Sequence, residues 1–164
     1  MTINKPTRQF VAQDLKIENW DSIAVYFKDL VEREINSIED FKIWLRDNSE
    51  LEAILEEDAA WRYIKMTIDT KDEALSKAYT FFVSEIQPQI APLEDTINRK
   101  LNSIKFTKEL ESDPAYHILF RGVRKALELY RKENIQLISE VATESQKFGA
   151  LSAAQSIEHD GETL

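Results

Sequence analysis

The chain has 164 residues, of which 43% are hydrophobic and 31% are charged, and its formal net charge at pH 7 is −9. This composition is typical of one soluble globular domain, and the acidic excess argues against binding to nucleic acid or to an anionic membrane, since both need clustered Lys and Arg. There is no cysteine, which excludes disulfides and thiolate metal sites, and no signal-peptide run opens the chain, so a cytoplasmic protein is expected.

The scarcity of glycine indicates the fold class. Only three glycines are present, and the first is Gly122. A sheet protein of this length needs many tight turns, and tight turns favour glycine. We therefore expect an all-α fold, a bundle of about six or seven mostly antiparallel helices. Residues 1–18 are expected to be an irregular lead-in, 19–155 a helical domain, and 156–164 a truncated β-hairpin or disordered tail.

Two helices are predicted in the first part of the chain. Apolar residues between Trp20 and Ile35 recur at steps of three and four, which predicts an amphipathic helix of about 17 residues. Ser37 then has the character of an N-cap, and a short apolar face follows it.

The stretch from Ser49 to Glu52 matches a capping box, in which serine and glutamate side chains satisfy the free amides at a helix start. It predicts a new helix over 50–68, with Trp61 and Ile64 turned inward. The acidic run in this helix is expected to be a water-facing stripe, with its first two members favourable near the helix N-terminus. The run comprises Glu50, Glu52, Glu56, Glu57 and Asp58.

A second capping box, from Thr70 to Glu73, predicts a helix over 71–87. Pro88 and Pro92 each remove an amide donor and crowd the preceding turn. We therefore expect a kink or break near Pro88, followed by a helix through Leu101.

The remaining helices carry clearer start signals. Asp113 and Pro114 form a cap followed by a proline at the first helical position, which predicts the start of a helix. The last long helix is expected from about Ile135 to Ala154. After it, the tight-turn pair Asp160-Gly161 predicts a short hairpin.

No catalytic motif can be read from the chain. A zinc peptidase needs H-E-x-x-H and a di-iron bundle needs Glu-x-x-His pairs, but the only histidines are His117 and His159, and neither has such a partner. The adjacent Glu158, His159 and Asp160 alternate faces in a strand, so a solvated hairpin is favoured over a metal site. No catalytic residue, metal ligand or cofactor is expected in this chain.

One basic stripe stands out on this acidic protein. It is expected on the helix after Pro114, with two interpretations: pairing with neighbouring acidic helices, or a docking face for an acidic partner surface or a peptide carboxylate. The stripe comprises Arg121, Arg124, Lys125 and Lys132.

Four segments in order carry a resemblance to a known family. They read RYIKMTIDTKD at 62–72, AYTFFVSEIQP at 78–88, ELYRKEN at 128–134 and GETL at 161–164. In that order they resemble the N-terminal region of the oligoendopeptidase F-like zinc metallopeptidases, relatives of the thimet oligopeptidases. The resemblance extends from about Leu15 to Leu164.

The resemblance implies a helical N-terminal lobe that forms one wall of an enclosed peptide channel. In that family zinc, H-E-x-x-H and a further Glu ligand belong to a larger catalytic part, so none of them can be assigned here and this chain alone should show no peptidase activity. The implied partners are that catalytic domain and an oligopeptide substrate. A severed lobe should also expose a broad apolar patch, which could form a homodimer, and its last residues should be poorly ordered.

The alternative function is a stand-alone acidic helical interaction module without catalysis. Such a module would take a partner helix or peptide in a groove between helices. Its surface should be closed apart from that groove.

Overall fold

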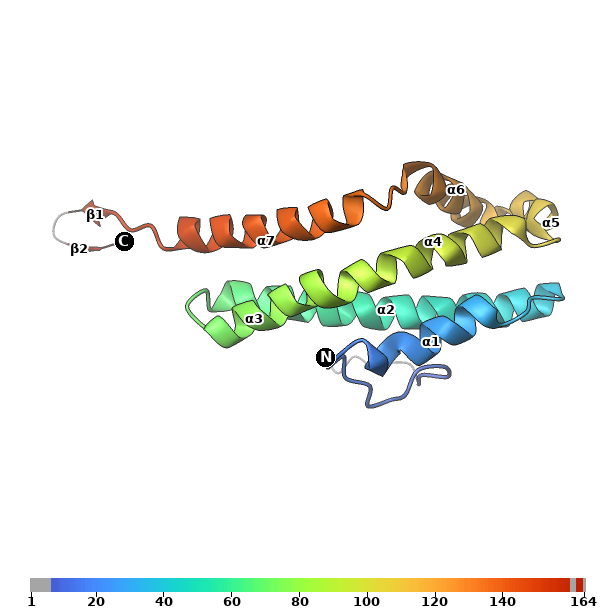
Figure 1. Ribbon diagram of the computed structural model, residues 1–164, viewed down its shortest axis with the longest axis horizontal. Helices are drawn as coiled ribbons and strands as arrows, with labels where there is room; N and C mark the ends of the chain where they lie inside the picture. The colour runs from blue at the N-terminus through green and yellow to red at the C-terminus, as the bar shows by residue number, and fades with distance from the viewer. Residues whose placement is uncertain (1–6, 160–161, 164) are drawn as a thin grey trace.

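The computed structural model describes residues 7–159 and 162–163. Over these residues the fold is all-α, as predicted, with a two-stranded hairpin after the last helix (Figure 1). No described helix is long and apolar enough to cross a membrane. The helices are α1 (Asp21–Glu32), α2 (Ile38–Ile68), α3 (Glu73–Phe81), the π-helix η1 (Phe82–Ile86), α4 (Gln87–Ser103), α5 (Thr107–Ser112), α6 (Pro114–Leu129) and α7 (Asn134–Ala153), and the strands are β1 (Glu158–His159) and β2 (Glu162–Thr163).

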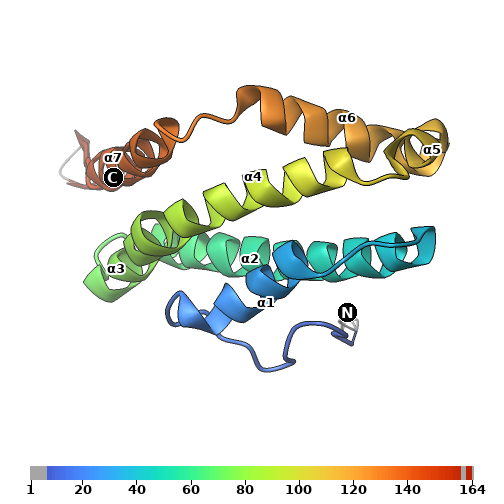
Figure 2. The same cartoon turned by 45° about the vertical axis from the view of Figure 1, so that its right-hand side comes forward.

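The helices form an elongated stack rather than a closed ring (Figures 1 and 2). Helix α1 packs against both α2 and α4, and the long helix α2 runs antiparallel to α1 and to the continuous rod of α3, η1 and α4. On the far side of α4, α6 and α7 follow one another along the stack. Consequently α7 has neighbours on one side only, mainly η1 and α4, and it also reaches α3 through a hydrogen bond from Gln146 to Ser76.

Helix α2 corrects the sequence interpretation of Ser49. The helix begins after Ser37, whose Oγ accepts the amide of Asp40 at 3.1 Å, and continues to Ile68 without interruption. Ser49 therefore lies inside the helix and caps nothing, because no Gly or Pro between 38 and 68 makes the backbone leave the helix upstream. Glu52 instead accepts a hydrogen bond of 2.8 Å from the side-chain amide of Asn48.

Two other helix boundaries also differ from the predictions. Helix α1 ends at Glu32 rather than near Ile35, because Arg33 has extended backbone dihedrals. Helix α3 is capped by Asp72 and not by Thr70: the Asp72 carboxylate accepts the amides of Ala74 at 2.8 Å and Leu75 at 3.2 Å. The carboxylate of Asp72, two residues after Thr70, thus replaces the predicted hydroxyl as the cap.

The predicted break at Pro88 is absent, and a π-helical turn is present instead. The amide of Gln87 donates to the carbonyl of Phe82, five residues earlier, and α4 continues directly through Pro88 and Pro92 to Ser103. A π-turn changes the hydrogen-bond register of the helix. The chain therefore places Pro88 in the first turn of α4, where no amide donor is needed.

The last part of the chain follows the predictions closely. The Asp113 carboxylate accepts the amide of Ala115 at 2.9 Å, with Pro114 as the first residue of α6. Helix α7 lies within one residue of the predicted bounds. Strands β1 and β2 pair antiparallel, with Glu158 opposite Thr163. The predicted turn residues Asp160 and Gly161 lie outside the described residues.

The core lies where α1, α2, α4 and α6 meet. Phe41 of α2 stacks on Phe120 of α6 with ring centroids 6.2 Å apart, and the indole nitrogen of Trp44 donates to the carbonyl of Leu30 at 2.8 Å. Trp61, predicted to face inward, is 52% exposed. Since α2 is one unbroken helix, its phase is set by Leu51, Leu55 and Met66, and Trp61 falls outside that buried face.

Candidate functional site

The predicted basic stripe is only partly one surface. Arg121, Arg124 and Lys125 lie exposed on α6 beside an open depression of about 520 Å³. Lys132 lies beyond the end of α6 at Leu129, so its predicted place on this helix is wrong. Arg124 pairs with Glu111 at 2.5 Å and Lys125 with Glu128 at 3.1 Å, as expected of charges paired with acidic neighbours. A docking role for the stripe stays a prediction.

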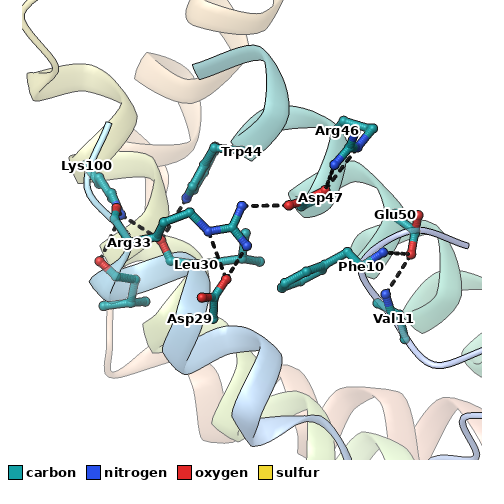
Figure 3. Close-up of polar contacts among 11 residues, drawn as sticks. Phe10, Val11, Asp29, Leu30, Arg33, Trp44, Arg46, Asp47, Glu50 and Lys100 are labelled. Carbon is teal, nitrogen blue, oxygen red and sulfur yellow. Dashed lines mark hydrogen bonds and ion pairs between the residues drawn. The ribbon is translucent and has the colours of Figure 1, made fainter. Parts of the chain in front are cut away.

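A polar network ties the lead-in to α2 (Figure 3). The Glu50 carboxylate accepts three successive backbone amides, from Gln9 at 2.8 Å, Phe10 at 2.9 Å and Val11 at 2.7 Å. Partial burial raises the pKa of Glu50, but these three donors outweigh it, so the pKa is lowered overall. Glu50 was predicted to face water near a helix start, and it anchors a distant segment instead.

In the same region, the side chain of Lys100 from α4 caps the C-terminal end of α1 (Figure 3). Its ammonium donates to the carbonyls of Leu30 at 2.7 Å, Val31 at 3.0 Å and Arg33. Burial, followed by the charge of Arg33, lowers the pKa of Lys100. This network binds helices together and contains no recognisable catalytic arrangement.

Arg33 links α1 to α2 beside Lys100. Its guanidinium, just beyond the end of α1, pairs with Asp29 of α1 and with Asp47 of α2, the latter at 2.6 Å. Asp47 is 4% exposed and also binds Arg46 at 2.6 Å. A buried carboxylate held by two arginines is satisfied, and it has a structural role here.

A cleft of about 590 Å³ lies between α2, α4 and the start of α7. Its walls are mainly apolar, and the π-helix η1 forms part of them. We call it the acidic cleft, because three carboxylates also line it, Glu52 and Glu56 one turn apart on α2 and Glu94 on α4. Among the described residues none of the three forms an ion pair.

The carboxylates of the acidic cleft act on one another. Burial raises the pKa of Glu94, and the negative charges of Glu52 and Glu56 raise it further. Burial likewise raises the pKa of Glu52, with a smaller opposing effect from the Asn48 hydrogen bond. The sequence had indicated Glu52 and Glu56 only as part of a solvated stripe, and nothing local in the sequence pointed to Glu94, since tertiary packing alone brings α4 alongside α2.

A second, smaller cavity of about 270 Å³ lies between the end of α2, α3 and α7. Tyr63 and Tyr79 meet there with ring centroids 5.8 Å apart. Helix α7 presents small residues to it, among them Ala142, Gly149 and Ala150. The small side of α7 therefore faces the molecule, and its large apolar side faces outward.

Two apolar stripes lie uncovered on the described surface. On α7 the stripe has five members, all more than half exposed, and Phe148 reaches 73%. On the second half of α2, Trp61, Ile64 and Ile68 form another, with Ile68 at 79% exposed. The α7 stripe comprises Leu137, Ile138, Val141, Phe148 and Leu151, of which Ile138 lies at the edge and also lines the acidic cleft.

The described residues offer no site that fits a zinc ion. No group of three or more His, Cys, Asp or Glu side chains is placed to hold a metal among them. His117 is exposed on α6. The side chains of the tail cluster, Glu158 to Asp160, lie outside the described part of the structure.

Comparisons with known proteins give one match. The family model of the peptidase M3 N-terminal domain matches residues 10–130, which run from the lead-in to the end of α6. Neither the curated proteins nor the solved structures include a match. Because the family model spans well over half of the 164 residues, the chain belongs to the peptidase M3 N-terminal domain family.

Proposed function

We propose that this chain is the N-terminal helical lobe of a cytoplasmic, zinc-dependent oligopeptidase of the oligoendopeptidase F type. The lobe shapes one wall of the channel that admits peptides and excludes folded proteins. In this proposal zinc and the groups that activate water belong to a separate catalytic part, as the resemblance to the oligoendopeptidase F-like family implies. The observation that carries the proposal is the family match over residues 10–130.

The uncovered apolar stripes support a lobe that packs against something larger. Isolated exposed apolar side chains are ordinary, but a row of five on one helix face is typical of an interface. The α7 stripe lies next to the region matched by the family model, at the end of the stack where the hairpin projects (Figure 1). We propose that the catalytic part covers it, and that a second copy of this chain covers it when the lobe is alone.

The experiment compares this 164-residue chain with the protein encoded by its complete reading frame. Both are purified, loaded with zinc and assayed with internally quenched peptides and with a folded protein of similar sequence composition. We expect chelator-sensitive cleavage of the peptides only by the longer protein, and no activity from the lobe. A reading frame that ends at Leu164 would discard the proposal and leave the stand-alone interaction module.

A further inference from the structure

The acidic cleft has features that the proposed wall of a channel does not require. It is a concave site of about 590 Å³, within the size range of ligand pockets, and it is lined mainly by apolar side chains with a few polar groups. It lies against a π-helical turn, and such turns occur frequently at functional sites. Its position is fixed because Ser139 of α7 donates to the carbonyl of Val83 in η1 at 2.9 Å.

The charges of the cleft are of one sign and are not neutralised within the described chain. Glu52 and Glu56 of α2 and Glu94 of α4 line the same cleft, open to solvent, and the charges of the first two add to burial in raising the pKa of Glu94. The next basic residue along α2, Arg62, is already bound to Asp58 at 2.5 Å and to the carbonyls of Ile17 and Ala78. A cation from outside would relieve the repulsion.

The walls indicate what kind of cation fits. Leu55, Phe82, Ile90 and Ile138 line the same cleft as the three carboxylates. A lysine or arginine side chain combines a long apolar stem with a charged head, so it can lie along apolar walls while its head reaches carboxylates. Gln87 also lines the cleft, and a glutamine side chain can exchange hydrogen bonds with a peptide backbone.

We propose that the acidic cleft between α2, α4 and α7 binds a basic side chain, lysine or arginine, of a peptide. This deepens the proposed function, because it makes the cleft a docking point for basic oligopeptides on the lobe. The argument for this occupant is charge complementarity in an apolar groove on a protein of net charge −9.

The test uses the 164-residue chain and a pair of matched peptides. The first is acetyl-Leu-Lys-Leu-amide, and the second replaces lysine with norleucine, which keeps the stem and removes the ammonium. Binding is followed by amide NMR shifts of the labelled chain. We expect the lysine peptide to shift signals of Ala91, Glu94 and Ser139 and to bind about tenfold more tightly than the norleucine peptide. Added salt should reduce that difference.

Variants distinguish binding in the cleft from nonspecific attraction of a basic peptide to an acidic protein. The double variant E52Q/E94Q should lose most of the preference for lysine over norleucine. E85Q removes one negative charge on η1, half the change of the double variant, outside the residues that line the cleft, and should bind like the unchanged chain. Because glutamine keeps the shape of glutamate and relieves repulsion, both variants should fold, which the unfolding temperature checks.

Several outcomes would overturn the inference. They are equal binding of the two peptides, shifts located away from the cleft, an equal effect of E85Q and E52Q/E94Q, or concentration-dependent shifts of cleft residues without peptide, which would assign the cleft to a second copy. Absence of peptidase activity in the longer protein would refute the proposed function and leave this binding result intact. An active longer protein whose cleft shows no preference for lysine would refute the inference about the cleft and leave the proposed function intact.

Discussion

The ammonium of Lys100 lies 2.7 Å from the carbonyl oxygen of Leu30, seventy residues earlier in the chain. Leu30 is in the last turn of α1, where carbonyls have no partner within the helix. Helix α1 has no basic residue in its own last turn, so Lys100 of α4 supplies the positive charge that favours a helix C-terminus. The same ammonium lies 5.6 Å from the ring of Trp44. One side chain thus joins α1, α2 and α4.

Replacing this lysine should destabilise the stack. In K100M the stem is retained, but the carbonyls of Leu30, Val31 and Arg33 lose their donor, and we expect a loss of about 2 kcal/mol in the free energy of unfolding. Urea denaturation measures the change. Lys108 is exposed and serves as the matched control, so K108M should be close to neutral. Equal losses in the two variants would refute the capping role.

Glu50 should make stability depend on pH. Its folded pKa is lowered, so its contribution is present above the unfolded pKa and is lost as pH falls through the folded pKa. E50Q weakens the acceptor for the amides of Gln9, Phe10 and Val11, and we expect a loss of about 1 kcal/mol at pH 7, discounted for the access of water. The difference from the unchanged chain should vanish in acid. A difference that is the same at pH 7 and in acid would contradict this account.

Glu94 should make stability depend on pH in the opposite direction to Glu50. Its folded pKa is raised by burial and by Glu52 and Glu56, so the unchanged chain loses stability as pH rises from the unfolded pKa through the folded one. E94Q removes the repulsion and should be more stable at pH 7 by about 0.5 kcal/mol, with no gain in acid. Thermal unfolding at several pH values checks this, with E85Q as the control. A destabilised E94Q at neutral pH would disprove the repulsion.

Ser139 should contribute more to the free energy of unfolding than a serine on a helix usually does. It is 7% exposed, and its hydroxyl donates to the carbonyl of Val83 in the π-helix, 56 residues away. In S139A that buried carbonyl loses its donor, and we expect a loss of about 1–2 kcal/mol. S145A changes a more exposed serine of the same helix and should cost much less. Hydrogen exchange should also quicken around 82–86 in S139A alone.

The α7 stripe should govern self-association of the lobe. Phe148 is 73% exposed, so F148E replaces an exposed apolar side chain with a charged one and leaves the core intact. The unfolding temperature should therefore hardly change. Sedimentation should show less association for F148E than for the unchanged chain. S152E adds the same charge near the end of α7 without removing an apolar group, and it should associate like the unchanged chain. If S152E dissociates equally, charge rather than apolar contact is responsible.

Local sequence signals were sufficient where the structure depends on neighbours within about one turn of helix. The Asp113 cap, the bounds of α7 and the pairing after it were confirmed because their donors, acceptors and turns are close in the chain. The same rules failed at Ser49, since a capping box matters only if the preceding residues leave the helix. They failed at Pro88 because a π-turn relocates the proline to a tolerated position.

The sequence by itself determined that this protein is helical and acidic, and four short segments were enough to indicate its family. Only the tertiary structure decided which helix faces are used. Trp61 points outward, Lys100 reaches α1, and Glu94 meets Glu52 and Glu56 across two helices. The physical reason is that helix formation depends on neighbours three or four residues away, whereas the packing of a helix face depends on partners far along the chain.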